Sequence, residues 1–156
     1  MATNFVWGTR GTVMNLLTTE LNTLANGSST AFGPVINNTL ASLGGFELCD
    51  LNFKLASSSL ALTTASYLQV CLVPTVDGTN YPKLTSGASY KLALQDYLVA
   101  TIWLFPGTLS AEVIYENVQG VRLPGCNFKT VLINQSGVTL PASGNTLDAY
   151  PTPEQY

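Results

Sequence analysis

Few side chains in this sequence are suited to acid–base or nucleophilic catalysis. The chain has no histidine, so the common hydrolytic triads lack their general base. Glycosidase chemistry needs only two carboxylates held close together, and Glu112 and Glu116 are near each other in sequence. On a strand both would face the same side of a sheet, and two solvent-facing carboxylates are the favoured interpretation. We therefore expect that the protein is not an enzyme. The carboxylates are Glu20, Glu47, Asp50, Asp77, Asp96, Glu112, Glu116, Asp148 and Glu154.

The cysteines and glycines form no pattern that is typical of a metal or cofactor site. Cys49, Cys71 and Cys126 are widely spaced and include no CxxC pair, whereas structural zinc sites group thiolates and imidazoles at short spacing. Cys49 and Cys71 lie in apolar runs and are expected to be buried free thiols, with a disulfide as the alternative. Asp77 and Asn80 could belong to a weak calcium loop, but a turn is favoured. No phosphate-binding or dinucleotide-binding motif is present, so we expect no metal and no cofactor.

A cluster of aromatic side chains could form a different kind of site, a carbohydrate-binding groove. Tyrosines in strands more often lie at the edge of the core with the hydroxyl group hydrogen-bonded, and this interpretation is favoured here. A glycan-binding function is kept as the alternative. The candidate residues are Tyr67, Tyr81, Tyr90, Tyr97 and Tyr115.

The composition is that of a single domain with little charge. Its 156 residues fit one domain. Charged residues make up 10 %, hydrophobic residues 46 %, and the mean hydropathy is +0.26. Such a chain has either a surface of Ser, Thr and Asn or faces that neighbouring subunits cover. The net charge of −3 argues against a nucleic-acid partner. No apolar run approaches the roughly 20 residues of a membrane helix and no secretory signal is visible, so no membrane partner is expected.

The N-terminal region is expected to consist of an arm and a helix. Residues 1–11 have no periodicity and indicate an extended arm that becomes ordered by docking. An amphipathic helix is predicted over residues 12–26, with Leu17 and Leu21 on its apolar side. Asn26–Gly27 is typical of a helix end.

From residue 46 onward the hydrophobic residues alternate or run continuously for a few positions, as they do in strands. A bulge is expected near Cys49–Asp50, and Asn134–Gly137 is typical of a hairpin turn. Many short antiparallel strands predict a mainly β fold, a β-sandwich or jelly roll, with residues 12–156 forming a single domain. The predicted strands are Phe46–Leu55, Tyr67–Val73, Tyr97–Phe105, Ala111–Val118, Phe128–Ile133, Val138–Leu140 and Thr146–Tyr150.

Three stretches carry a resemblance to a known family. The first is TELNTLANGS at Thr19–Ser28, and the second is VCLVPTVDGTNY at Val70–Tyr81. The third and most specific runs from Leu123 to Gln155 and contains LPGCNFK, NQSG and ASGNTL. Together they resemble virion structural proteins of tailed bacteriophages, of the head decoration (cement or auxiliary capsid) type. Cys71 and Cys126 depart from the family's pattern, and the N-terminal arm has no counterpart in it.

The resemblance implies a structural protein on the capsid exterior, assembled in the cytoplasm of the bacterial host. Its partner would be the major capsid protein, whose subunits it bridges and stabilises through many small contacts. A homotrimer is expected, because capsid symmetry offers threefold junctions. The alternative is a glycan- or receptor-binding β-sandwich module of a head fibre or tail fibre. The residues expected to contact the capsid or a sister subunit belong to the arm and the helix: Phe5, Trp7, Arg10, Leu17 and Leu21.

The arm hypothesis makes a first testable prediction. Trp7 lies among glycines with no local core to enter, so it is the best anchor candidate. Deleting Met1–Gly11 is expected to abolish binding to particles while the circular dichroism spectrum of the truncated protein stays that of the full chain. Full capsid occupancy by the truncated protein would overturn the hypothesis.

Overall fold

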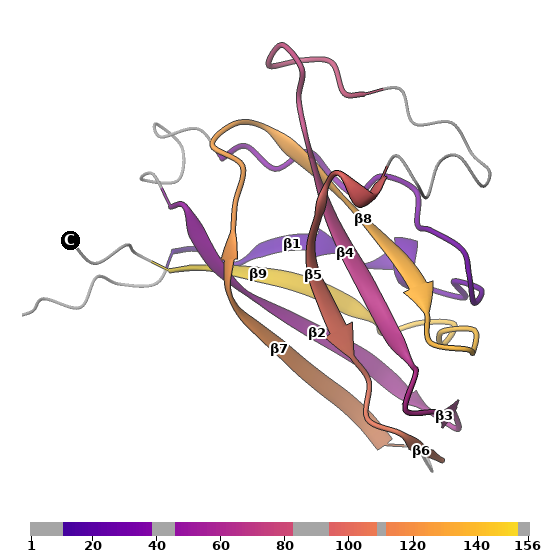
Figure 1. The fold of residues 1–156 in the computed structure, drawn as a ribbon. Coiled ribbons are helices and arrows are strands. Elements are labelled where there is room, and N and C mark those ends of the chain that lie inside the picture. The colour runs from indigo at the N-terminus through magenta and orange to yellow at the C-terminus, as the bar shows by residue number, and fades with distance from the viewer. Residues whose placement is uncertain (1–10, 39–45, 83–93, 109–111, 153–156) are drawn as a thin grey trace, which may run out of the picture.

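The structure is a computed structural model that describes residues 11–38, 46–82, 94–108 and 112–152. It is mainly β with antiparallel sheets, as predicted (Figure 1). A short 3-10 helix, η1 (Thr19–Leu21), follows the first strand. The strands within the described residues are β1 (Met14–Leu17), β2 (Leu48–Ser58), β3 (Ala61–Leu62), β4 (Tyr67–Pro74), β5 (Leu98–Trp103), β6 (Gly107–Thr108), β7 (Glu112–Arg122), β8 (Phe128–Gln135) and β9 (Thr146–Thr152).

The strands form two larger sheets and one small one. The four-stranded sheet has the order β1-β9-β2-β7, the three-stranded sheet has the order β5-β4-β8, and β3 pairs with β6. Residues 28–38 run antiparallel along the free side of β8, so the second sheet gains a fourth, irregular member. The contacts of this segment include the bridges Ser29–Ile133 and Ile36–Phe128 and the hydrogen bonds from Thr30 N to Leu132 O and from Gly33 N to Thr130 O, both 2.9 Å.

The two larger sheets pack face to face around one hydrophobic core (Figure 1). In β2 the alternate residues Leu51, Phe53 and Leu55 point inward and are buried. Leu68 of β4 and Phe128 of β8 meet them from the other sheet and are fully buried. Each such side chain stabilises the fold by about 1.5–3 kcal/mol relative to an exposed position.

The central parts of β4 and β8 are buried on both faces, which explains the unbroken apolar runs Val70–Val73 and Val131–Ile133. Their second face carries a smaller cluster that includes Cys71, Val73 and Val131, against which Phe32 and Tyr97 pack. A strand that is covered on both faces has no solvent-facing residues, so its sequence does not alternate between apolar and polar residues.

The helix predicted over residues 12–26 is wrong. Met14–Leu17 is the strand β1, which pairs with β9, and only Thr19–Leu21 turns helically. The leucines that suggested a helix are buried, but the backbone around them pairs with the C-terminal third of the chain instead of with itself. These pairs include Thr23 N to Pro141 O and Leu140 N to Leu24 O, both 3.0 Å.

Asn134 is a buried polar residue that fixes this arrangement. Its side-chain Nδ2 donates to Leu24 O (2.9 Å) and to Val138 O (2.8 Å). Its Oδ1 accepts from the backbone N (3.0 Å) and the Oγ (2.6 Å) of Ser136. One amide thus holds both the turn after β8 and the segment after η1. The predicted strand Val138–Leu140 is wrong for the same reason, because its backbone serves these contacts and no sheet partner.

Asn145 has an equivalent role in the next turn of the chain. It is 2 % exposed, and its Oδ1 accepts from Ala56 N (3.0 Å). Its Nδ2 donates to Pro141 O (2.8 Å) and to Asn22 Oδ1 (3.2 Å). The turn before β9 is therefore tied both to the end of β2 and to the segment after η1.

A bulge lies where the sequence predicted one, but the extra residue belongs to the other strand. The β2–β7 register shifts between Cys49 and Leu51 because β7 contains one additional residue there. Gly120 adopts a φ of +67°, which favours glycine. Asp50, 6 % exposed, accepts a hydrogen bond from Gly120 N at 3.3 Å.

The two sides of the sandwich differ. On one side, β1 and residues 28–38 are in direct contact. Gly33 lies so close to Leu16 O that a larger side chain at this position would collide with it. On the other side β5 and β7 are the outermost strands of their sheets. These two strands approach each other, and a hollow lies along the edge of the sandwich between them. We call this side the open edge.

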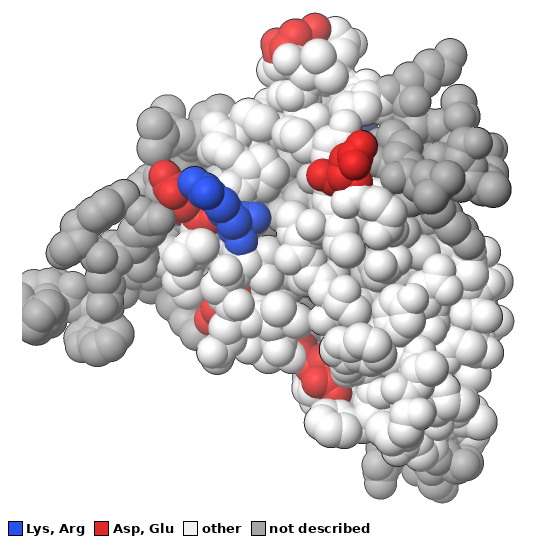
Figure 2. Space-filling model, viewed as in Figure 1, with Lys and Arg blue, Asp and Glu red and all other residues white. Residues whose placement is uncertain are grey.

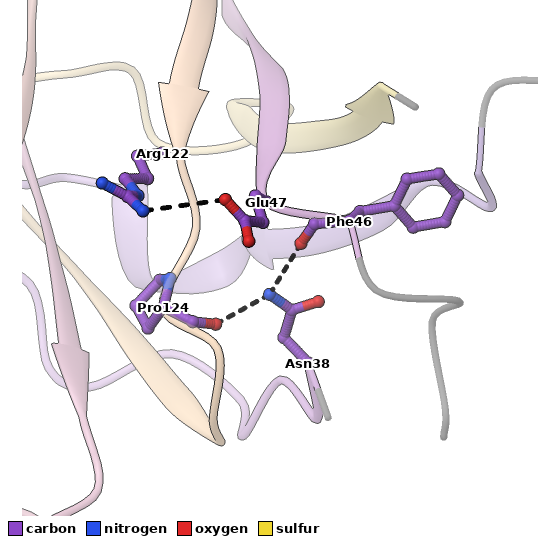
Figure 3. A network of polar contacts seen from close by, with 5 residues as sticks. All are labelled: Asn38, Phe46, Glu47, Arg122 and Pro124. Carbon is purple, nitrogen blue, oxygen red and sulfur yellow. Dashed lines mark hydrogen bonds and ion pairs between the residues drawn. The ribbon is translucent and has the colours of Figure 1, made fainter. Parts of the chain in front are cut away.

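A polar network holds the end of the 28–38 segment (Figure 3). Asn38, 3 % exposed, donates through Nδ2 to Phe46 O (3.2 Å) and Pro124 O (2.7 Å). Nearby, Arg122 and Glu47 form an ion pair at 3.6 Å. Both charged side chains are largely exposed, so the pair contributes at most about 1 kcal/mol. The segment is therefore held mainly by the two hydrogen bonds of the buried Asn38 amide.

The Asn134 network predicts a specific loss of stability. Replacing Asn134 with Ala removes four hydrogen bonds and leaves buried backbone and hydroxyl groups short of partners, so we expect the free energy of unfolding to fall by about 2–4 kcal/mol. Urea denaturation measures this change. The matched control is Asn15→Ala at an exposed position, which is expected to change stability by less than about 0.5 kcal/mol. Equal effects of the two substitutions would contradict the role of Asn134.

Candidate functional site

The open edge of the sandwich exposes large aromatic side chains. Trp103 is 60 % exposed and Phe105 is 74 % exposed. Both lie on or just after β5 and point away from the core, because Ile102 before Trp103 and Leu104 between the two aromatic residues are buried. A face that exposes adjacent large apolar residues is typical of a contact surface.

A cleft of about 410 Å³ lies between β5 and β7. We call it the edge cleft. Its lining is mostly apolar and includes Ile102, Trp103, Phe105, Pro106, Glu116 and Val118. Trp103 also packs on Tyr67, with ring centroids 5.1 Å apart and planes at 49°. Figure 2 shows that this face has few charged residues and broad uncharged areas between them. The surface is therefore suited to a contact with another apolar surface.

Glu116 is the one carboxylate that lines the edge cleft. It pairs in register with Phe53, so its side chain is on the core-facing side of β7. Burial raises the pKa of Glu116 above its ordinary value. The strand register agrees with the expectation that Glu112 and Glu116 share one side of the sheet. The position of the Glu112 side chain lies outside what the structure describes, so no carboxylate pair can be measured.

A second hollow lies on the outer face of the four-stranded sheet. We call it the polar groove; its volume is about 300 Å³. Its lining is polar because the residues that alternate with the inward-pointing positions of β2 and β9 are polar. Asn52 and Asn117 are joined across the strands, with Asn117 Nδ2 donating to Asn52 Oδ1 at 2.5 Å. The groove-forming side chains are those of Asn52, Lys54, Tyr115, Asn117, Thr146, Asp148 and Tyr150.

The tyrosines that could have formed a carbohydrate platform lie at separate places. Tyr67 packs on Trp103, and Tyr97 packs on the smaller core cluster. Tyr81 lies under the ammonium group of Lys129, 4.4 Å from its ring centre, and 6.3 Å from the ring of Phe32. Tyr115, 72 % exposed, lies in the polar groove. Tyr90 is outside the described residues. The four described tyrosines therefore do not form one platform. Tyr150, which the sequence pattern did not single out, joins Tyr115 in the groove.

The residues expected to contact a capsid fall into two groups. Leu17 and Leu21 are fully buried in the chain's own core. Their apolar character is explained by this burial, so they are corrected from contact residues to core residues. Phe5, Trp7 and Arg10 lie outside the described residues.

The Asp77 turn uses its carboxylate internally. Asp77 Oδ1 accepts from the backbone N of Thr79 (3.0 Å) and Asn80 (2.7 Å), and Oδ2 accepts from Asn80 Nδ2 (2.7 Å). These bonds lower the pKa of Asp77 to about 2. The geometry agrees with a turn, the favoured interpretation. In the portion of the chain that the structure describes, no group of three or more His, Cys, Asp or Glu side chains could hold a metal ion.

Sequence reasoning missed both surfaces. Trp103 and Phe105 were assigned to one apolar strand, and the alternation of exposed and buried positions there is visible only once Ile102 and Leu104 are known to be buried. The polar groove left a clearer signal, because polar residues alternate with Leu51, Phe53 and Leu55. The missing information was which strands lie beside each other.

No protein-family model, curated protein sequence or solved structure matches this chain with significance. Among the residues that the structure describes, none belongs to a helix of the length and apolarity needed to cross a membrane.

The cysteines give a prediction that tests the core. Cys49, Cys71 and Cys126 are free, and the first two are buried, as expected. Burial raises the pKa of both Cys49 and Cys71 to about 12, so neither is a thiolate near neutral pH. We expect Ellman's reagent to label Cys126 in the native protein and all three thiols after denaturation. Labelling of Cys49 or Cys71 at the rate of Cys126 would contradict the packing described above.

Proposed function

We propose that this chain is a structural protein of a tailed-phage particle that decorates the capsid and bridges subunits of the major capsid protein. The observation that carries the proposal is the open edge, where Trp103 and Phe105 are exposed beside an apolar cleft. The resemblance of Thr19–Ser28, Val70–Tyr81 and Leu123–Gln155 to decoration proteins of tailed phages supports it. The location on the capsid exterior and the absence of enzymatic activity belong to the same proposal.

The strand order supports a finer assignment of the fold as a jelly roll. A jelly roll has two four-stranded sheets in which the first strand pairs beside the last, because the chain folds as a doubled-over ribbon. Here β1 lies beside β9, residues 28–38 lie beside β8, and β4 lies between β5 and β8. Viral capsid and lectin domains use this architecture, although a fold alone does not determine a function.

The chemistry of the open edge suits a protein partner. A few residues carry most of the binding free energy in protein interfaces, and Trp is enriched among them. Aromatic residues in general are enriched at interfaces, and charged residues are depleted from their centre. Trp103 and Phe105 meet the first condition, and the sparsely charged face around them meets the second (Figure 2). In the proposed assembly the edge contacts the capsid or a sister subunit of a homotrimer, and repeated weak contacts give high occupancy.

A second candidate function is a glycan- or receptor-binding module of a head fibre or tail fibre. The polar groove favours this candidate, because it combines exposed aromatic and hydrogen-bonding side chains outside the core. A fibre module is present in far fewer copies per particle than a decoration protein, so stoichiometry separates the two.

The edge hypothesis is tested by replacing its aromatic residues. The double variant Trp103→Ser and Phe105→Ser is expected to bind particles assembled without this protein at least about 30-fold more weakly, because truncating a single interface anchor already costs about 2 kcal/mol or more. Co-sedimentation with such particles measures the affinity. The control is Val76→Ser, which removes a side chain of similar exposure (73 %) in the turn after β4. Equal binding by the double variant and the control would contradict the proposal.

A further inference from the structure

The polar groove is built from a row of polar residues that crosses the whole four-stranded sheet. In register, Asn117 of β7 faces Asn52 of β2, Asn52 faces Asp148 of β9, and Asp148 faces Asn15 of β1. Side chains at facing positions of neighbouring strands lie about 5 Å apart. Each strand thus contributes one amide or carboxylate to a continuous line on the outer face.

Two tyrosines flank this row on opposite sides. Tyr115 faces Lys54 in the neighbouring row of the same face on one side. Tyr150 faces Asp50 in the neighbouring row on the other side. Tyr115 is 72 % exposed, so no neighbour among the described residues covers its ring. The groove therefore has a hydrogen-bonding floor between two aromatic side chains.

Asp148 leaves an acceptor unused at the floor of the groove. Its Oδ1 is shielded from solvent and accepts no hydrogen bond from the residues that the structure describes. Desolvation raises the pKa of Asp148, which agrees with this shielding. A buried acceptor without a donor has an energetic cost, because it has lost its hydrogen bonds to water. A ligand hydroxyl group that donates to Oδ1 would recover this cost.

The row also keeps spare hydrogen-bonding capacity beside Asp148. Asn117 Nδ2 donates to Asn52 Oδ1 and to Leu51 O (3.3 Å). Within the described residues, these bonds leave Asn52 Nδ2 and Asn117 Oδ1 without a hydrogen-bond partner in the protein. A donor and two acceptors then lie along one line, an arrangement that matches the hydroxyl groups of a sugar ring, each of which donates and accepts.

Charge and shape favour a neutral ligand. Lys54 brings one positive group to the lining of the groove, and Asp148 and Glu116 bring two carboxyl groups. Desolvation raises the pKa of both carboxyl groups, and such an environment disfavours an anion. A volume of about 300 Å³ is small for a ligand site. A peptide strand would pair with a sheet edge and not with this face.

We propose that the polar groove binds a neutral, hydroxyl-rich saccharide, with Asp148 and Asn52 hydrogen-bonding its hydroxyl groups and Tyr115 packing against a sugar ring. This site is on the outer face of the sheet, beside the edge cleft, with which it shares Glu116 and Asn117. The inference rests on the glycan-binding candidate function and not on the capsid role, which is assigned to Trp103 and Phe105.

The experiment uses the full chain and three kinds of probe: neutral hexose oligosaccharides, neutral N-acetylhexosamine oligosaccharides and sialylated glycans, first on an array and then by NMR titration. We expect binding to at least one neutral class. Asp148→Ala and Tyr115→Ala are each expected to weaken that binding about tenfold or more. The control is Val113→Ala, two residues from Tyr115 on β7 and also exposed (41 %), which is expected to bind as the parent chain does.

Three outcomes would overturn the inference: no binding of any neutral glycan by the parent chain, binding of sialylated glycans only, or equal affinities of the two groove variants and the control. Tyr115 is exposed, so its variant is expected to keep the circular dichroism spectrum and thermal midpoint of the parent chain. This variant keeps the test decisive if Asp148→Ala is unstable. Particle occupancy is a separate measurement, so the failure of the glycan site and the failure of the capsid role are distinguishable.

Discussion

Two buried asparagines determine how the N-terminal region of this protein packs. Asn134 binds Leu24 O and the turn after β8, and Asn145 binds Asn22, Pro141 and Ala56 N. Their amides satisfy backbone groups that would otherwise be buried without partners, which is costly. They therefore hold residues 22–28 against the C-terminal turns, and this position directs residues 28–38 along β8. The closed side of the sandwich depends on these contacts.

These contacts join stretches that the sequence analysis singled out. The stretch TELNTLANGS contains Asn22 and Leu24, whereas NQSG and ASGNTL contain Asn134 and Asn145. Segments more than one hundred residues apart in the sequence thus meet through the side chains of Asn134 and Asn145. The edge around Trp103 lies outside the three stretches, whereas Thr146, Asp148 and Tyr150 of the polar groove lie within Leu123–Gln155. A fold alone does not determine a function, so both binding proposals rest on the chemistry of these surfaces.

Much of the sheet structure could be predicted from the sequence because its strands bury one or both faces in a regular pattern. The alternation of the apolar residues Leu51, Phe53 and Leu55 with polar residues identified β2. Short unbroken apolar runs identified β4 and β8. The helix was wrong because Leu17, Leu21 and Leu24 fit helical spacing although each is buried by a different local geometry. The conformation of this segment depends on its contact with the distant side chain of Asn134, and hydrophobic periodicity cannot reveal such a contact. The polar groove required the register of β2, β7 and β9, which depends on pairing between remote segments.

The proposed decoration role rests on the difference between the two sides of the sandwich. One side is completed by the chain's own N-terminal segment, and the other presents Trp103 and Phe105 to a partner. The most direct test is gel densitometry of purified particles against the major capsid protein. The proposed role predicts about one copy per capsid subunit, or about one per three. A ratio of a few per cent or less would contradict decoration and would assign the chain to the tail or a fibre.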